Sequence, residues 1–319
     1  MSGSITGYGL LQALSADSAT VRGQLSVATQ QAATGKVAEA YAGLGAAAKV
    51  SLDLRPQIAH QQAWSANIDS ATARLGVAQS ALAGIGAIAA SFYAKTNMLN
   101  GLQPGVTDGV AAEARSALVQ VAQLLNSRAG NTYVFAGQDT ATPPVPDTSA
   151  TTLITTLLAS DTATPPFTAT IGTAVPTVEI GEGQRAPVGV LANRNTLTVS
   201  VAPTTGSYMR DIMRALATLA TTVDGPGLQA TAADTRTRLQ SAIGAALAEA
   251  GALGGVQAGL ATRKTQLAET QAALTAQVSG AEDVDLAATL TRVSQLQTQL
   301  QASYQLTAGL KSMSLAQYL

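Results

Sequence analysis

The sequence predicts a mainly α-helical protein with a β-rich insertion, in which N- and C-terminal helical arms form a long coiled-coil rod. Apolar residues recur at alternating spacings of three and four over long stretches near both ends of the chain. Eight of the 11 prolines lie between Pro143 and Pro203, and proline interrupts helices. Only 12% of the 319 residues are charged and 3% are aromatic, whereas about 25% charged residues is usual. Such a composition favours a structural chain over an enzyme.

The N-terminal arm, residues 1–137, contains three predicted helices. The first ends at Gly35, a residue type that commonly stops a helix. The third spans about Asp108 to Arg128, and the turn from Gly130 to Gly137 leads into an extended Tyr133-Val134-Phe135. The apolar positions of the first helix are Leu11, Leu14, Ser18, Val21, Leu25, Ala28 and Ala32, and those of the second are Trp64, Ile68, Ala71, Leu75, Ala78, Leu82, Ile85, Ala89, Phe92, Thr96 and Leu99.

The middle segment, residues 138–205, is rich in Pro and Thr and is predicted to be an outer domain. Three short runs read as β-strands between turn residues: Thr168–Ile171, Thr177–Ile180 and Thr196–Val201. The sequence Gly181–Ala186 matches a loose dinucleotide-binding pattern, but no helix follows that could present its N-terminus to a pyrophosphate. We therefore predict a strand–turn–strand there.

The C-terminal arm, residues 206–319, is predicted to pair with the N-terminal arm. One helix covers Met209–Val223, and a longer one covers Thr231–Val278 with loosening near Gly251, Gly254 and Gly255. The last helix is predicted to begin at a capping box, Ser279–Glu282, with Asp283 and Asp285 favouring its positive end. Because burial within this last helix barely offsets the entropy of ordering it, we expect the chain ends to fold only when packed.

The composition excludes several classes of site. A net charge of −1 and a pI near 5.8 argue against a nucleic-acid partner. The chain has no Cys and one His. His60 with Asp53 and a serine could in principle form a triad, but both residues lie on or near a predicted amphipathic helix. Glu282, Asp283 and Asp285 match no full calcium loop, and helix capping explains them without a metal. We predict no catalytic, cofactor or metal site.

A membrane helix and a cleaved signal peptide are also weighed against the sequence. Leu75–Ala94 is uncharged over a length that could cross a bilayer. It contains Gln79, two serines and three glycines, however, and continues a helical pattern on both sides. The first residues lack the charged segment and long apolar run of a signal peptide. We predict neither membrane insertion nor a cleaved signal.

Both arms resemble the family of bacterial flagellins and flagellar hook-associated proteins of the hook–filament junction. The resemblance covers about three quarters of the chain and leaves the Pro/Thr-rich middle unmatched. Residues 41–45 depart from the acidic Asp-Pro stretch that the family usually has at this place. The segments that resemble the family are Gln30–Lys36, Asn131–Gly137, Glu282–Asp285, Leu296–Tyr304 and Ser314–Leu319. Asn131–Gly137 and the ending Ser-Leu-x-x-Tyr-Leu are closer to the junction protein than to flagellin.

The resemblance implies a non-enzymatic structural subunit of the extracellular flagellum, exported through the flagellar type III channel without a cleaved signal. Its terminal helices would pair as a coiled coil lining the assembly, and its middle domain would face outward. The implied partners are further copies in a ring or helix, a neighbouring hook-associated protein, flagellin and an export chaperone. The implied seam residues are Leu14, Val21, Leu25, Leu290, Val293, Leu296, Leu300, Leu310 and Leu315.

Three other interpretations of the sequence remain open at this point. The chain could be flagellin itself, the subunit of the filament. It could be a secreted enzyme with its activity in the middle domain, where Asp147, Asp161 and Glu179 are acidic candidates. It could also be a coiled-coil scaffold of the cytoplasm. Vigorous self-polymerisation of the purified chain would favour flagellin over a junction adaptor. Measurable turnover would favour an enzyme, and detection of the chain outside the cell would exclude a cytoplasmic scaffold.

Overall fold

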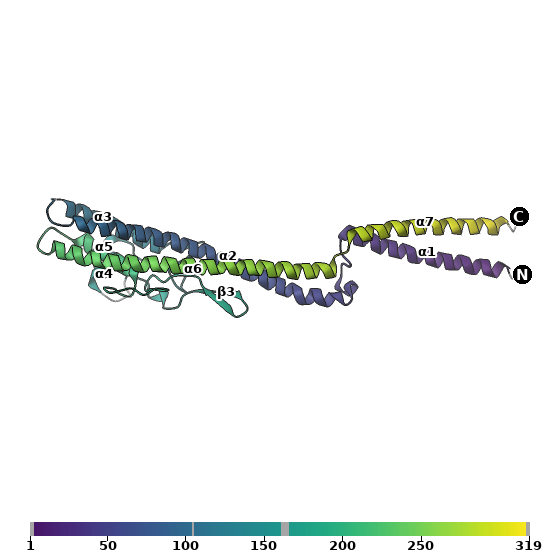
Figure 1. The fold of residues 1–319 in the computed structure, drawn as a ribbon, viewed down its shortest axis with the longest axis horizontal. Coiled ribbons are helices and arrows are strands. Elements are labelled where there is room, and N and C mark those ends of the chain that lie inside the picture. Colours follow the sequence, from purple (N-terminus) through teal and green to yellow (C-terminus); the bar gives the residue numbers. More distant parts are fainter. Residues whose placement is uncertain (1–2, 104, 161–165, 317–319) are drawn as a thin grey trace. The chain divides into compact units, whose positions relative to one another are not determined.

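The computed structural model describes residues 3–103, 105–160 and 166–316, and it describes their side chains except those of residues 3–8, 10, 11 and 310–316. The chain is mainly helical, with long helices and small two-stranded sheets (Figure 1). This confirms the predicted fold class. In chain order the elements are α1 (Gly3–Thr34), η1 (Tyr41–Leu44), α2 (Ala47–Lys95), η2 (Thr96–Met98), α3 (Val106–Leu125), β1 (Arg128–Ala129), β2 (Thr132–Tyr133), α4 (Ala150–Ala159), η3 (Ala169–Ile171), β3 (Thr177–Gly181), β4 (Gln184–Pro187), α5 (Tyr208–Thr221), α6 (Leu228–Glu282) and α7 (Leu286–Ala316).

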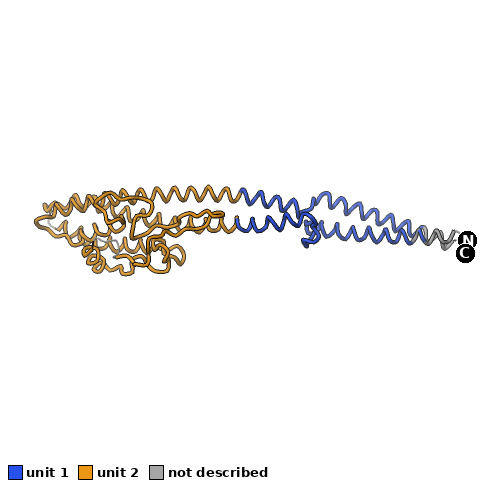
Figure 2. The backbone as a smooth tube through the Cα atoms, turned by 90° about the horizontal axis from the view of Figure 1, so that it is seen from below, with its two compact units in different colours: residues 1–60, 269–319 blue, residues 61–268 orange. Residues whose placement is uncertain are grey.

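Two compact units make up the chain. Unit 1 combines residues 1–60 with 269–319, and unit 2 comprises residues 61–268 (Figure 2, blue and orange). The long helices α2 and α6 each contribute one part to unit 1 and the other to unit 2. Each unit is therefore built from sequence segments that lie far apart in the chain.

Unit 1 is centred on the antiparallel pair of α1 and α7. Gly35 ends α1 with a φ of 71°, a left-handed conformation that glycine adopts without a steric penalty. Along the pair, Ser18 faces Ser303, and their hydroxyl oxygens are 2.6 Å apart. Nearer the connectors, Val21 and Ala28 pack with Leu296. The seam is narrow because most of its residues are small.

Unit 2 has a large apolar core. The predicted apolar run of α2 is buried, with Leu75, Ala78, Ile85 and Ala89 fully inaccessible to solvent. On α6, residues at heptad spacing from Leu239 to Leu267 are buried on the same stripe. Helix α5 is buried along almost its whole length. These helices exclude water from a continuous cluster, and the middle segment covers part of it.

The middle segment contains less β-structure than the sequence predicts. The strand–turn–strand at Gly181–Ala186 is confirmed, because β3 pairs antiparallel with β4. The predicted strand at Thr168–Ile171 is wrong, since Ala169–Ile171 forms the 3-10 turn η3. The predicted strand at Thr196–Val201 is also wrong: this segment pairs with no strand in the described part of the chain. Helix α4 was not predicted at all.

The predicted start of the last helix is wrong as well. Ser279–Glu282 is the end of α6, and α7 begins at Leu286. Asp285 caps α7 instead, because its carboxylate accepts a hydrogen bond from the Ala288 backbone N–H at 3.1 Å. Helix α6 is also continuous through Gly251, Gly254 and Gly255, where loosening was expected.

Two helical stretches, Ala47–Met98 and Leu228–Glu282, are long and apolar enough by composition to cross a membrane. A core helix of a soluble protein meets the same criterion, because it buries one apolar stripe against its neighbours. Leu75 and Ile85 of α2 are buried in this way within unit 2.

Candidate assembly interface

The residues predicted for the terminal seam fall into three groups. Val21 and Leu296 are buried between α1 and α7, and Leu25, Val293 and Leu300 pack against them. Leu14 is half-buried on α1, while Leu290 is 52% exposed on α7 and lies beside the seam. The side chains of Leu310 and Leu315 lie outside the described residues. Ser18 and Ala28, which belong to the apolar repeat of α1, also lie in the seam, and the structure adds Ser303 of α7.

The connectors that lead into the two terminal helices are joined by backbone hydrogen bonds. The Val37 N–H donates to the Glu282 carbonyl at 2.7 Å, and the Val284 N–H donates to the Gly35 carbonyl at 3.0 Å. Lys36 and Asp283 thereby form an isolated antiparallel bridge. We call Lys36, Ser51, Arg55, Glu282 and Asp283 the clasp, because these residues hold the connectors together within unit 1.

The side chains of the clasp form a charge-assisted network around Glu282. Arg55 donates through Nη2 to both carboxylate oxygens, at 2.8 and 2.7 Å. The Ser51 hydroxyl donates to the same carboxylate. Lys36 Nζ lies 2.5 Å from Asp283 Oδ1 and 3.5 Å from Glu282 Oε2. Two-pronged arginine–carboxylate pairing of this kind fixes geometry as well as contributing energy.

These contacts shift the ionisation of the clasp carboxylates. The Ser51 hydroxyl, followed by Arg55, lowers the pKa of Glu282 below its ordinary value. The hydrogen bond from Lys36 lowers the pKa of Asp283, and the reciprocal bond raises the pKa of Lys36. Both carboxylates are therefore ionised at neutral pH, and the clasp is an ionic joint that depends on their charge.

One flank of α7 is apolar and faces solvent. Leu286, Leu290 and Tyr304 are exposed, and their positions at four- and seven-residue multiples place them on one side of the helix. That side is adjacent to the sector that contacts α1. On α1, Val27 is likewise exposed, and it lies between two shallow hollows. The terminal pair thus covers only part of its own apolar surface.

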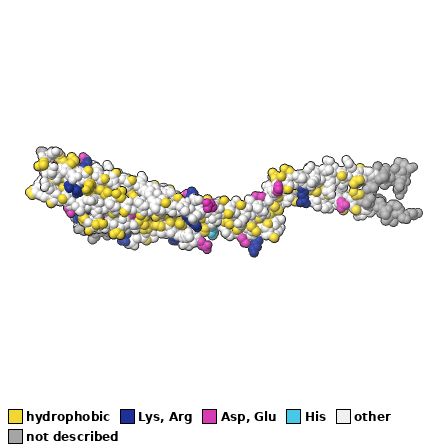
Figure 3. Space-filling view, in the orientation of Figure 1, with side chains coloured by type: hydrophobic (Ala, Val, Ile, Leu, Met, Phe, Trp, Pro, Cys, Tyr) yellow, Lys and Arg dark blue, Asp and Glu magenta, His cyan; other side chains and the backbone are white. Residues whose placement is uncertain are grey.

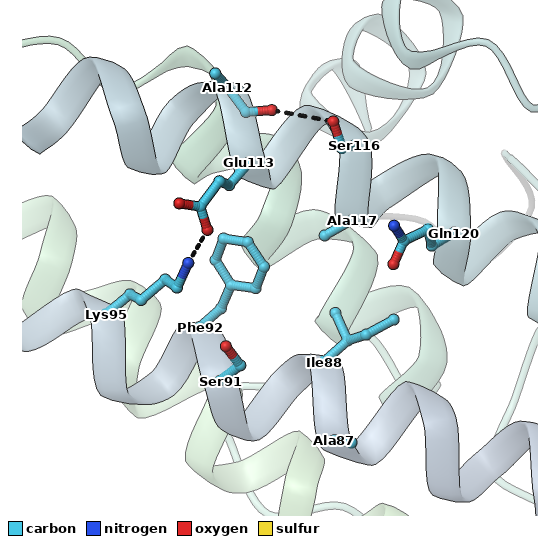
Figure 4. A pocket seen from close by; sticks show the side chains of 10 residues that line it. All are labelled: Ala87, Ile88, Ser91, Phe92, Lys95, Ala112, Glu113, Ser116, Ala117 and Gln120. Atoms are coloured by element: carbon cyan, nitrogen blue, oxygen red, sulfur yellow. Dashed lines mark hydrogen bonds and ion pairs between the residues drawn. The ribbon is translucent and has the colours of Figure 1, made fainter.

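Unit 2 has an open groove of about 600 Å³ between α2 and α3 (Figure 4). Lys95 and Glu113 form an ion pair across it, and Lys95 Nζ also lies 5.3 Å from the centre of the Phe92 ring. The remaining lining residues are small or neutral. The two charges satisfy each other, so the groove offers no unbalanced group to a charged ligand.

The residues considered for chemistry do not gather into a site. Asp53 and His60 lie on exposed positions of α2 in unit 1. Glu282 and Asp283 are engaged in the clasp, and Asp285 caps α7. Within the described residues, no group of three His, Cys, Asp or Glu side chains is arranged to hold a metal ion. On the face drawn in Figure 3, charged side chains are sparse among neutral and apolar ones.

Paired terminal helices, an ionic joint at their base and a partly uncovered apolar flank are features of the class of helical structural proteins. The comparisons with known proteins agree with this class. Residues 237–319 match the family model described as the bacterial flagellin C-terminal helical region. No match is found among curated protein sequences.

A solved structure from Vibrio parahaemolyticus, assigned as a flagellar hook-associated protein, has a similar fold. Its TM-score to this chain is 0.57 at 12% sequence identity, and the match covers 74% of this chain and 97% of that one. Residues 237–319 are therefore a bacterial flagellin C-terminal helical region, which confirms the family resemblance of the sequence for this part of the chain. The likeness to the solved structure shows a shared fold.

Proposed function

We propose that the protein is the adaptor that joins the flagellar hook to the flagellin filament. The observation that carries the assembly part of this proposal is the terminal pair of unit 1. A narrow seam leaves Leu290, Tyr304 and Val27 exposed, and apolar surface of this kind marks protein–protein contacts. The nine seam residues named from the sequence would mediate packing within and between copies.

Two further observations favour the adaptor over flagellin. The segment Asn131–Gly137 resembles the junction protein, and in the structure it contains strand β2 of the β1–β2 hairpin, with Phe135 fully buried. The chain ends in Ser-Leu-x-x-Tyr-Leu, as the junction protein does. The likeness to a structure assigned as a hook-associated protein supports the same choice.

The proposal includes the remaining features that the resemblance implies. The protein would leave the cell through the flagellar type III channel with the help of an export chaperone. It would then contact a neighbouring hook-associated protein on one side and flagellin on the other. Its middle domain would face outward and would have no enzymatic activity.

Localisation separates the adaptor from flagellin. We expect an antibody against the middle segment to label one short zone next to the hook in sheared flagellar preparations. Labelling along the whole filament, or growth of long filaments from the purified chain alone, would identify a flagellin instead.

A seam variant tests the role of unit 1. Leu296→Asp places a charge at a buried position of the α1–α7 seam, so we expect it to abolish incorporation into flagella. The matched control is Leu306→Asp, an equally large change at an exposed position of the same helix. Normal incorporation of Leu296→Asp would contradict the assignment of this seam.

A further inference from the structure

The loop of residues 195–206 connects the middle segment to α5 and has closed ends. The Asn195 N–H donates to the Gly206 carbonyl at 2.9 Å, and the Asn195 carboxamide accepts the Tyr208 N–H at 2.9 Å. Compact surface loops whose ends meet are frequently functional. The loop contains the alternating Thr196–Val201 pattern that the sequence analysis interpreted as a strand, although it pairs with no strand among the described residues.

Two buried carboxylates hold this loop in place. Glu249 of α6 is fully buried and accepts the Leu197 N–H with both oxygens, at 3.2 and 3.1 Å. Asp211 of α5 accepts the Thr204 hydroxyl at 2.7 Å and the Thr205 N–H at 2.9 Å. The Ser241 hydroxyl of α6 also donates to the Val201 carbonyl. Because these groups satisfy backbone atoms that a neighbouring strand would otherwise bond, the loop needs no strand partner.

The loop fixed in this way presents apolar side chains to solvent. Val199 is 89% exposed, Val201 is 76% exposed and Leu197 is 38% exposed. Burying a carboxylate costs free energy even when it is hydrogen-bonded, and burial raises the pKa of Glu249. The buried Glu249 carboxylate therefore costs free energy, and the loop that it binds holds its apolar side chains in solvent. Rigid display of this kind lowers the entropic cost of binding.

A groove of about 450 Å³ between α2 and α6 is apolar and uncharged, like the exposed face of the loop. Its floor and walls are Ala, Gly, Leu and Ile side chains, with Gln79 as the polar exception and no charged residue. Leu247, on α6, lines the groove and is itself exposed. The loop from Asn195 to Gly206 is also uncharged. Contact between the loop and the groove would bury no unpaired charge. Burial of an unpaired charge is what usually opposes a poorly matched interface.

The loop and the groove lie on opposite sides of α6 at the same level. Ser241 and Glu249 contact the loop, whereas Ile243 and Leu247 line the groove. Ser241 and Ile243 are two positions apart, as are Leu247 and Glu249, and two positions on an α-helix differ by about 200°. One surface is therefore available to a copy on one side of the molecule, and the other surface to a copy on the opposite side.

We propose that the 195–206 loop of one copy inserts Val199 and Val201 into the α2–α6 groove of a second copy at the same axial level. This inference rests on the proposed function, since it specifies how the subunits associate side by side. The contact is heterologous, because each copy uses a different surface on each side. Repetition of such a contact generates a ring or a shallow helix rather than a closed dimer.

Disulfide cross-linking tests the contact directly, because the chain has no cysteine of its own. The variant carries Val199→Cys together with Ala87→Cys, and it is oxidised both in flagella and as concentrated purified chain. We expect a ladder of trimers and larger species, since a head-to-tail contact continues beyond two copies. The matched control carries Leu102→Cys, at a position 80% exposed, with Ala87→Cys and should give no ladder.

A ladder no stronger than the control in both samples would overturn the proposal. If the cross-linking variant is incorporated into flagella without a ladder, the loop contact is wrong while the adaptor function stands. A second variant, Val199→Asp with Val201→Asp, should reduce incorporation at least tenfold without altering helical content, because both side chains are exposed in the single chain. Unchanged incorporation of this variant would also overturn the contact.

Discussion

Units 1 and 2 hold their helices together with different kinds of side-chain contact. Unit 2 encloses fully buried Leu, Ile and Phe side chains from α2, α3, α5 and α6. Unit 1 has a seam with three buried apolar residues, and it adds an ionic clasp at the base of that seam. Apolar burial provides most of the free energy of folding, whereas oriented polar contacts provide specificity. The comparison indicates that unit 2 is the more stable unit and that unit 1 is the less stable one.

The largest expected effect compares the same substitution in the two units. Leu118→Ala, at a fully buried site of unit 2, should lower the free energy of unfolding of that unit by about 4 kcal/mol. Leu296→Ala, in the seam of unit 1, should cost about 2 kcal/mol, because its smaller cluster collapses more easily around the gap. Amide hydrogen exchange resolved by segment measures both. Equal costs would contradict the contrast between the units.

The clasp gives the next largest effect. Glu282→Gln removes the carboxylate charge to which Arg55 and Ser51 donate hydrogen bonds. Exchange of the Val37 and Val284 amides should therefore accelerate at least about tenfold. Unit 2 amides should be unchanged. Asp53→Asn is a matched control, since it neutralises an exposed carboxylate on the same stretch of α2. Unaltered exchange in Glu282→Gln would show that the backbone bridge alone holds the connectors.

The two units should respond to acid in opposite directions. In unit 1 the pKa values of Glu282 and Asp283 are lowered, so their stabilisation is present above about pH 4 and is lost as the pH falls through the lowered values. In unit 2 burial raises the pKa of Glu249, so its stabilisation is present below about pH 4 and is lost as the pH rises through the raised value.

Segment-resolved exchange between pH 3 and pH 7, corrected for intrinsic rates, measures this divergence. Acidification should loosen the connectors at Val37 and Val284 while it stabilises unit 2, which slows exchange of the core amides of α5 and α6. The Glu249→Gln variant should lose this pH response of unit 2 and keep that of the clasp. Parallel loosening of both regions would contradict the assigned pKa directions.

The smallest expected effect concerns the polar layer of the seam. Ser18→Ala removes a hydroxyl that lies 2.6 Å from that of Ser303, and this should cost about 1 kcal/mol in unit 1. The double variant with Ser303→Ala should cost little more than either single variant, because the partner hydroxyl no longer remains unsatisfied. A double-mutant cycle with fully additive costs would show that the two serines do not interact energetically.

The helices were predictable from the sequence because their information is local. Heptad spacing identified the apolar faces of α1, α2 and α7, and Gly35 marked the end of α1. The capping box failed for a non-local reason. Ser279–Glu282 has the right residue types, but Arg55, 227 positions away, binds Glu282 at the end of α6. No periodicity within the last 40 residues contains that information.

The missing strand at Thr196–Val201 has a similar explanation. Alternation of β-branched and apolar residues favours an extended backbone, but the segment bends at Thr196 and Leu197. Its N–H and carbonyl groups are bound by Glu249 and Ser241 of α6 rather than by a neighbouring strand. Sequence patterns reveal the preference of a segment for extension, whereas the identity of its hydrogen-bond partner depends on the tertiary structure. The clasp and the roles of Glu249 and Asp211 beneath the loop were not predicted for the same reason, because these contacts depend on the tertiary structure.

The bridge between Lys36 and Asp283 also bears on the order of folding. It joins residues 247 positions apart, so forming it from an unfolded chain would require closing a very long loop. Once unit 2 has folded, the ion pair of Asp69 with Lys264 joins α2 to α6, 33 residues after Lys36 and 19 residues before Asp283. The loop that remains to be closed is about 50 residues long, which reduces the closure cost by about 1.4 kcal/mol. Folding of unit 2 therefore lowers the entropic cost of closing the Lys36–Asp283 bridge, and we expect unit 2 to form before the two connectors join.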